Sequence, residues 1–126
     1  MSKMEEQAAY KSKGQTGDNL ITVLRKPLSV NDCWRGRRFK TPAYKQYEKD
    51  VLWLLPRFKL PEPPYKVYYE FGVSSPLADF DNPVKPLTDL LQKKYHFNDK
   101  SIELATIRKV LVPKGQEYVR FKIEHL

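Results

Sequence analysis

Cysteine is nearly absent from this sequence of 126 residues, since Cys33 is the only one. A single cysteine excludes an intrachain disulfide and favours a reducing compartment. Long apolar runs are also missing, because none approaches the roughly 18 residues of a membrane span, and the N-terminus has no apolar signal segment. We therefore expect a cytoplasmic protein with no membrane partner.

Histidine is scarce as well, which limits the chemistry that the chain can perform. His96 and His125 have no cysteine or second histidine at ligand spacing, and this argues against a zinc site. No serine or cysteine stands near a histidine in a nucleophile motif, so covalent catalysis has no support. No organic cofactor is expected.

Acidic residues are the minority, with 15 Asp and Glu against 23 Lys and Arg, for a net charge of +8. The excess is concentrated in residues 25–40, which also include the aromatic side chains of Trp34 and Phe39. Such a patch suits the phosphate backbone of a nucleic acid, although a solvated basic loop has the same composition. The basic residues of this stretch are Arg25, Lys26, Arg35, Arg37, Arg38 and Lys40, against a single acidic residue, Asp32.

The chain divides into a short tail and one domain. Residues 1–18 are polar and lack hydrophobic periodicity, so we predict a flexible N-terminal tail, followed by a single domain over residues 19–126. Alternating apolar residues predict strands at 19–26 and 65–73. Residues 27–40, between them, lack periodicity and are predicted to form a loop.

Two helices are predicted. The Thr-Pro pair at residues 41–42 offers a capping hydroxyl and a proline suited to the first helical position, and Pro56 ends that helix. A second helix begins around Pro83, with Asp81 or Asn82 as its cap. The apolar faces of the two helices consist of Tyr44, Tyr47, Val51 and Leu54 or Leu55 in the first, and of Val84, Leu87, Leu90 and Leu91 in the second.

Two further strands are predicted at residues 102–112 and 117–126, joined as a hairpin through the turn at residues 113–116. The order of elements is then β-α-β-α-β-β. This order predicts an α+β domain, with a small sheet that is mixed or mostly antiparallel and two main helices.

Asp79 and Asp81 are separated by a single residue in this basic chain. If residues 77–81 are extended, the two side chains project to the same side, with Cα atoms roughly 6.5 Å apart. Two carboxylates at this separation suit Mg²⁺, which takes a few carboxylates, several waters and substrate phosphates. Asp99, beyond the second helix, is expected to complete the cluster, and Lys85 to hold a phosphate oxygen or to offset the repulsion between the carboxylates.

Each of these residues also has a purely structural interpretation. Asp81 or Asn82 can cap the helix, and Asp99 can cap a turn before the following strand. Lys85 with Asp81 and Asp89 can form an i, i+4 ladder, which contributes little stability on a helix surface. The metal-site hypothesis rests on all of these residues together, beside the basic patch.

Two other metal-site patterns are excluded by particular residues. An EF-hand loop beginning at Asp79 requires glycine and glutamate where this chain has Val84 and Leu90. A restriction-type nuclease core requires an acidic residue two positions before its lysine, and Pro83 stands there before Lys85.

The stretch DFDNPVKPLTDLL, followed by NDKSI, resembles the RusA-like Holliday-junction resolvases, small endonucleases common in phages and prophages. The shared pattern is Asp-x-Asp-Asn, a lysine three residues later, a helix with a further aspartate, and a final aspartate before a strand. The segments PLSVNDCW and TPAYKQY are also similar to the family, and the resemblance spans residues 20–125. The matching residues are Asp79, Asp81, Asn82, Lys85, Asp89 and Asp99.

This resemblance implies a Mg²⁺-dependent homodimeric endodeoxyribonuclease of DNA recombination and repair, which cuts four-way junctions by paired symmetric nicks. It implies that Asp79, Asp81 and Asp99 hold Mg²⁺, or Mn²⁺ in its place, and that these aspartates act with Lys85 in catalysis. Asn82 would support the carboxylates. The phosphates of the junction arms would be bound by Arg35, Arg37, Arg38 and Lys40. The alternatives are a catalytically silent DNA-binding module and a nuclease that acts on flaps or other branched DNA.

Overall fold

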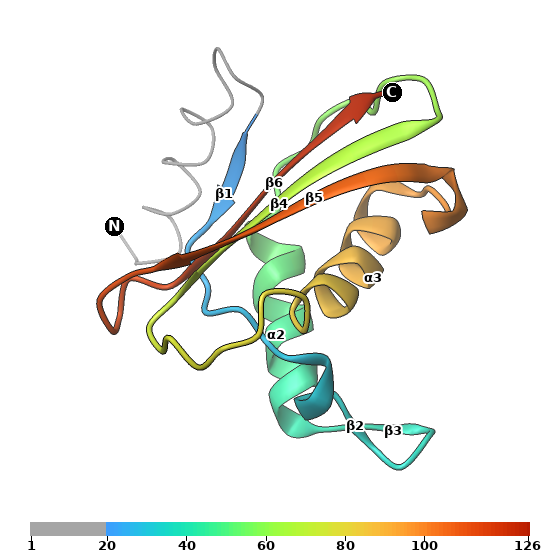
Figure 1. The fold of residues 1–126 in the computed structure, drawn as a ribbon. Helices are drawn as coiled ribbons and strands as arrows, with labels where there is room; N and C mark the ends of the chain where they lie inside the picture. The colour runs from blue at the N-terminus through green and yellow to red at the C-terminus, as the bar shows by residue number, and fades with distance from the viewer. Residues whose placement is uncertain (1–19) are drawn as a thin grey trace.

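The computed structural model describes residues 20–126, so the tail predicted for residues 1–18 lies outside the described residues. This part of the chain is a mixed α+β structure, as predicted, and a two-stranded ribbon projects from one end (Figure 1). The helices are α2 (Pro42–Leu54) and α3 (Val84–Tyr95), with 3-10 turns η1 (Val30–Asp32) and η2 (Asp99–Ser101). The strands are β1 (Ile21–Val23), β2 (Trp34–Arg35), β3 (Phe39–Lys40), β4 (Tyr65–Val73), β5 (Ile102–Leu111) and β6 (Tyr118–His125).

The main sheet is mixed, and its strand order is β1-β6-β4-β5. β5 runs parallel to β4, while β6 is antiparallel to both β4 and β1. The predicted hairpin of the last two strands is therefore wrong, because β4 lies between β5 and β6. The link between these two strands passes the end of β4, where the amide of Val112 donates to the carbonyl of Val73 at 2.8 Å.

Connection and burial explain this strand order. α3 joins β4 to β5, and a strand that returns after a helical crossover can run parallel to its neighbour. The alternate residues Val119, Phe121 and Ile123 of β6 are buried, so this strand lies inside the sheet. β5 is mostly exposed and forms the edge. The sequence pattern predicts each strand but not which strand lies beside it.

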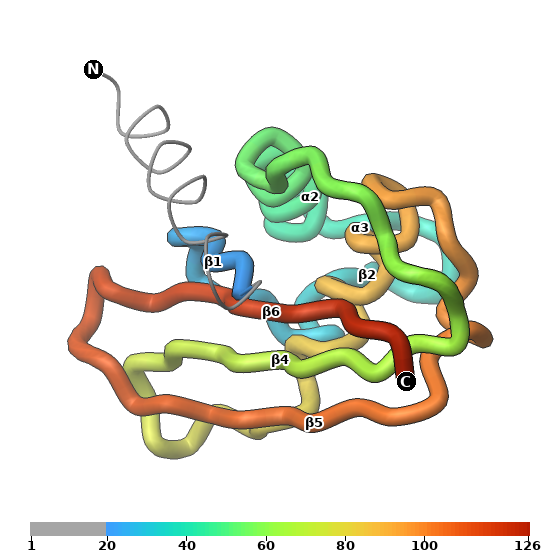
Figure 2. Tube along the Cα trace, turned by 90° about the horizontal axis from the view of Figure 1, so that it is seen from above, coloured from blue at the N-terminus to red at the C-terminus, as the bar shows by residue number. Residues whose placement is uncertain are grey.

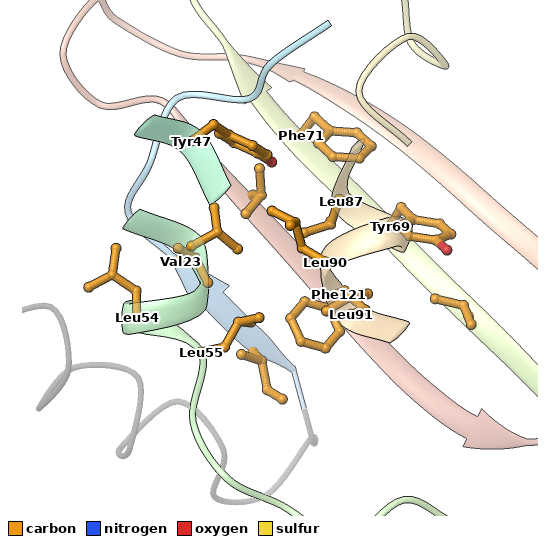
Figure 3. Packing of buried hydrophobic residues seen from close by; sticks show 14 of the residues in the cluster. Val23, Tyr47, Leu54, Leu55, Tyr69, Phe71, Leu87, Leu90, Leu91 and Phe121 are labelled. Carbon is orange, nitrogen blue, oxygen red and sulfur yellow. The ribbon is translucent and has the colours of Figure 1, made fainter. Parts of the chain in front are cut away.

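The hydrophobic core lies between the sheet and the two helices, which cover the same face (Figure 2). Leu87, Leu90 and Leu91 of α3 point toward the sheet residues Tyr69 and Phe121, as Figure 3 shows. The apolar face predicted for the second helix is thus confirmed. Within residues 20–126, no helix is long and apolar enough to cross a membrane.

The beginning and end of α2 follow from local sequence. The hydroxyl of Thr41 accepts a hydrogen bond from the amide of Tyr44 at 3.1 Å, and Pro42 occupies the first helical position. The helix ends at Leu54, just before Pro56. These predictions are confirmed, whereas the first strand is shorter than predicted because the chain turns where the amide of Arg25 donates to the carbonyl of Val23.

Tyr47 places a hydroxyl in the core without a hydrogen-bond partner among the described residues. A buried hydroxyl that loses water without gaining a partner destabilises the folded state. We expect Tyr47→Phe to raise the free energy of unfolding by about 1 kcal/mol in a urea titration. Tyr69→Phe is the matched control, because its hydroxyl lies 2.7 Å from Thr88 Oγ1, and it should lower stability by about 1 kcal/mol. Equal losses in both variants would contradict this account of Tyr47.

On the sheet face opposite the helices, one carboxylate is surrounded by donors. The side chain of Glu70 is only 6% exposed and accepts hydrogen bonds from the hydroxyls of Tyr68 and Tyr118 and, at 2.9 Å, from Arg120. Burial tends to raise its pKa, but these hydrogen bonds and the charges of Arg120 and Arg108 outweigh burial, so the pKa of Glu70 lies below its usual value. The ionised form is therefore the one that the fold stabilises.

The pH dependence of stability tests this cluster. A lowered pKa means that Glu70 contributes stability above the pKa of the unfolded chain and loses it as the pH falls through the folded pKa. We expect Glu70→Gln to lower the free energy of unfolding by about 2 kcal/mol at pH 7, and the difference from wild type to shrink under acidic conditions. Glu103→Gln, an exposed change on β5, is the control and should be neutral at both pH values. A Glu70→Gln effect independent of pH would contradict the assigned charge state.

Candidate metal and nucleic-acid site

The acidic loop, residues 74–83, follows β4 and turns rather than extending it. The amide of Ala78 donates to the carbonyl of Ser75 at 3.2 Å, and Lys109 of β5 donates to the carbonyls of Pro76 and Ala78 at 3.1 and 2.8 Å. The assumption of an extended segment over residues 77–81 is therefore wrong. Pro76 and the clamp from Lys109 bend the chain, so Asp79 and Asp81 do not simply share one strand face.

Asp79 and Asn82 form a contact of their own within this loop. Asn82 Nδ2 donates to Asp79 Oδ2 at 2.8 Å, and the carbonyl of Asn82 accepts from the amide of Val30 at 2.9 Å. Asp79 lines a hollow of about 490 Å³ between the acidic loop and residues 25–32. Asn82 thus touches one of the carboxylates that it was predicted to support, and it also ties the acidic loop to η1.

Asp81 and Asp99 are brought together from the two ends of α3. Both line a shallow hollow of about 440 Å³, together with Lys85, Thr88 and Tyr69. Both residues are exposed, and neither carboxylate accepts a hydrogen bond or forms an ion pair within residues 20–126. The hollow therefore presents two exposed carboxylates that have no hydrogen-bond or ion-pair partner within residues 20–126.

The capping roles considered for these residues are not what the structure shows. Pro83 occupies the N-cap position of α3 without a side-chain hydrogen bond, so neither Asp81 nor Asn82 caps the helix. The turn before β5 is capped by Asn98, whose side chain accepts from the amide of Lys100 at 2.9 Å, and not by Asp99. Both cap predictions are wrong because backbone turns bring other groups to these positions.

Two polar residues of α3, Thr88 and Gln92, form hydrogen bonds that fix the residues around the hollow. The hydroxyl of Thr88 contacts that of Tyr69 at 2.7 Å and donates to the carbonyl of Val84 at 2.8 Å. Gln92 Oε1 accepts from the backbone amide of Asp99 at 2.8 Å and so fixes the start of η2. Thr88 and Gln92 were missed from the sequence, although their i, i+4 spacing places them on one side of the helix.

Lys85 stands beside the hollow, with its side chain 61% exposed. Its ammonium donates to Asp89 Oδ1 at 2.8 Å, so of the predicted charge ladder only the rung to Asp89 is formed. The hydrogen bond to Asp89 raises the pKa of Lys85 more than burial lowers it, and the negative charges of Asp89 and Asp99 raise it further. Lys85 therefore carries a positive charge throughout the neutral range.

The donor set suits a hard cation. No group of three His, Cys, Asp or Glu side chains is placed to hold one ion within residues 20–126. Two carboxylates do line the same hollow, however, and Mg²⁺ in proteins is commonly bound through one or two carboxylates together with waters and substrate phosphates. Asp81 and Asp99 therefore fit this ion by the chemistry of their oxygens, while Asp79 lies in the neighbouring hollow.

The stretch predicted as a loop, residues 27–40, contains η1 and the ribbon of β2 and β3, so that prediction is wrong. The ribbon is too short to show periodicity in the sequence, and Gly36 makes its turn possible with φ of +64°. Arg35, Arg37 and Arg38 are exposed and have no ion pair among the described residues. Lys40 differs, because its ammonium donates to Glu48 Oε2 at 2.8 Å.

The ribbon starts next to α3. Burial, followed by the negative charges of Asp32 and Asp89, raises the pKa of the Cys33 thiol to about 11. Cys33 is thus a neutral buried side chain and not a nucleophile at physiological pH. The 3-10 turn η1, which leads into the ribbon, is hydrogen-bonded to the acidic loop through the amide of Val30 and the carbonyl of Asn82.

The comparison with protein-family models gives no match for this chain, and the comparison with curated proteins gives no relative. The RusA-like resemblance therefore rests on the sequence pattern itself.

Proposed function

We propose that this protein is a Mg²⁺-dependent structure-specific endodeoxyribonuclease of the RusA-like type, which resolves four-way DNA junctions by paired symmetric nicks. The observation that supports this most is that Asp81 and Asp99, two exposed carboxylates without a partner in residues 20–126, line one hollow together with the charged Lys85. Their structural alternatives, as helix and turn caps, are removed by the geometry of Pro83 and Asn98.

The chain's own residues then have distinct roles. Asp81 and Asp99 hold the metal ion, and Asp79, one hollow away and bonded to Asn82, stands at the edge of the site. Mg²⁺ supplies Lewis-acid charge neutralisation at the scissile phosphate and lowers the pKa of bound water. Lys85 places a permanent positive charge where negative charge develops on the phosphate oxygens.

In this proposal, the β2–β3 ribbon is the surface that binds the DNA backbone. Arg35, Arg37 and Arg38 are exposed and free of ion pairs in the described part of the chain, so they contact phosphates without first breaking a protein contact. Lys40 reaches a phosphate only by leaving Glu48, and in this proposal it mainly anchors the ribbon. The contacts of these arginines are independent of base sequence, as expected for a protein that selects DNA shape.

Paired nicks require two sites, and we propose that the protein acts as a two-fold homodimer in the cytoplasm. Each protomer would then present one hollow to one strand of the junction. Residues 20–126 contain one hollow that is lined by Asp81 and Asp99, so in this proposal the second site comes from a second protomer.

A cleavage assay on an end-labelled synthetic four-way junction tests the proposal. The assay compares Mg²⁺, Mn²⁺ and EDTA, and compares the junction with a flap and with a linear duplex of the same sequence. We expect symmetric nicks in the junction with Mg²⁺, none with EDTA, and an intact duplex.

The two alternative functions give different results in the same assay. Equal cutting of the flap would identify a nuclease of broader branched-DNA specificity. Tight junction binding with no cut in either metal, over several junction sequences, would identify a DNA-binding module and overturn the assignment of Asp81 and Asp99 as metal ligands.

A further inference from the structure

Phe39 is a large apolar side chain in an unexpected position, 72% exposed on the β2–β3 ribbon. The register pairs Trp34 with Lys40 and Arg35 with Phe39. Since successive residues of a strand point to opposite faces, the ribbon has one face formed by Trp34 and Lys40 and another formed by Arg35 and Phe39. The two faces have different surroundings.

The first face is attached to α2. The Trp34 ring meets the Tyr44 ring edge to face at 5.6 Å between centroids, and the Lys40 ammonium lies 5.3 Å from the same ring while bonded to Glu48. The amide of Thr41 also donates to the carbonyl of Cys33 at 2.9 Å, which closes the base of the ribbon. The ribbon is therefore fixed on the helix by one face, and the Arg35–Phe39 face is held outward.

The outward face combines an aromatic ring with positive charge. Arg35 lies directly across the ribbon from Phe39, and Arg37 and Arg38 precede Phe39 in the turn. No acidic residue lies within β2, the turn or β3. Aromatic rings that alternate with arginine bind unpaired nucleic acid, because a base stacks on the ring while the guanidinium groups hold the adjacent phosphates.

We propose that Phe39 stacks on an unpaired base of the branched DNA substrate, with Arg35 holding the phosphate of that nucleotide. The identity of the substrate rests on the proposed function, whereas the stacking itself needs only single-stranded or unpaired DNA. The closed base of the ribbon fixes the backbone at Phe39 before the DNA arrives, so little backbone freedom is lost on binding. Phe39 would thereby favour a branch point, where bases unpair easily, over an intact duplex.

A protein partner is the other possible occupant of an exposed ring, and charge argues against it here. A protein interface centred on Phe39 would have to neutralise Arg35, Arg37 and Arg38 with acidic groups of the partner, whereas the phosphates of DNA do so at every nucleotide.

Binding to fluorescent DNA tests the stacking in EDTA, where no cleavage takes place. The probes are a single-stranded oligonucleotide with 2-aminopurine and a four-way junction with 2-aminopurine at the branch point, each compared with the corresponding duplex. We expect wild type to quench the fluorescence of both probes. Phe39→Ala should lose the quenching and weaken binding to unpaired DNA roughly 5- to 150-fold, with duplex affinity changed less than about twofold.

Two further variants separate stacking from simple apolar contact. Phe39→Trp should retain quenching and affinity, because the indole also stacks, and Phe39→Leu should behave as Phe39→Ala. Full affinity of Phe39→Leu, or equal loss for duplex and unpaired DNA, would overturn the inference. A change in sedimentation of the free protein on Phe39→Ala, without a change in DNA affinity, would likewise overturn it and indicate a protein contact.

The outcomes distinguish this inference from the proposed function. Metal-dependent cleavage by a protein whose Phe39→Ala variant binds unpaired DNA like wild type would overturn the stacking alone. Phe39-dependent quenching by a protein that cuts no DNA with Mg²⁺ or Mn²⁺ would support the stacking and overturn the nuclease.

Discussion

Asp81→Asn is expected to reduce Mg²⁺-dependent junction cleavage by at least roughly 10³-fold, while junction binding persists or becomes tighter. The loss corresponds to about 4 kcal/mol of transition-state stabilisation, in the range that a Lewis-acid metal supplies. Binding is kept because the variant removes one negative charge from a surface that faces phosphates. The fold is kept because the Asp81 carboxylate makes no hydrogen bond or ion pair with any residue in 20–126.

Variants at the other aspartates are expected to lose cleavage activity to an extent that depends on whether the residue lines the same hollow as Asp81. Asp99→Asn should resemble Asp81→Asn, since the two residues share the hollow. Asp79→Asn should cause a smaller loss, because Asp79 lies in the adjacent hollow and is held by Asn82. Glu103→Gln, at an exposed carboxylate on β5 that lines neither hollow, is the control for charge alone and should leave the rate nearly unchanged.

Cleavage rates at saturating Mg²⁺, binding in EDTA and thermal unfolding together decide this prediction. A metal titration of Asp81→Asn should show weaker Mg²⁺ binding. An Asp81→Asn variant that cuts at the wild-type rate would exclude Asp81 as a metal ligand, whatever the behaviour of Asp99→Asn.

Reversing the three ribbon arginines has the second-largest expected effect. The variant with Arg35, Arg37 and Arg38 changed to Glu should bind a four-way junction roughly 10²- to 10³-fold less tightly at about 0.1 M salt, because three phosphate contacts become repulsive. The slope of log affinity against log salt concentration should fall by about three. Stability should be unchanged, since these side chains make no ion pair in the described residues.

A control variant with the same change in net charge separates a local contact from overall attraction. Arg57, Lys59 and Lys114 are basic and lie outside the ribbon, beyond the end of α2 and in the β5–β6 turn. Changing these three to Glu should weaken binding only slightly. Fluorescence anisotropy over a salt series measures both variants, and equal losses would show that the ribbon is not the DNA-binding surface.

The parts of the fold that the sequence predicts well are those determined by neighbouring residues. Thr41 and Pro42 mark the start of α2 because the cap bond and the missing proline amide act within one helical turn. The buried faces of β4 and β6 follow from alternation, which is also local. The pairing of β5 and β6 was wrong because it depends on which strand returns to the centre of the sheet, and proximity in the chain favoured a hairpin.

The candidate site shows the same division. Asp79, Asp81 and Asp99 could be selected from residue type and spacing, but the position of Asp79 in a separate hollow could not, because the acidic loop turns at Ser75–Ala78. That turn is held by Lys109, a residue with no sign of this role in the sequence. The outward position of Phe39 likewise depends on how the other face of the ribbon packs on Tyr44.

The clamp from Lys109 also has a consequence for the order in which the protein assembles. Lys109 follows Ala78 by 31 residues, and it reaches the acidic loop only when β5 is in register beside β4. A growing chain therefore exposes Asp79 and Asp81 well before the residue that shapes their loop, and before Asp99 is made. The loop therefore gains its shape only after β5 has been synthesised, and an incomplete chain that ends before β5 carries the acidic residues without the clamp that bends their loop.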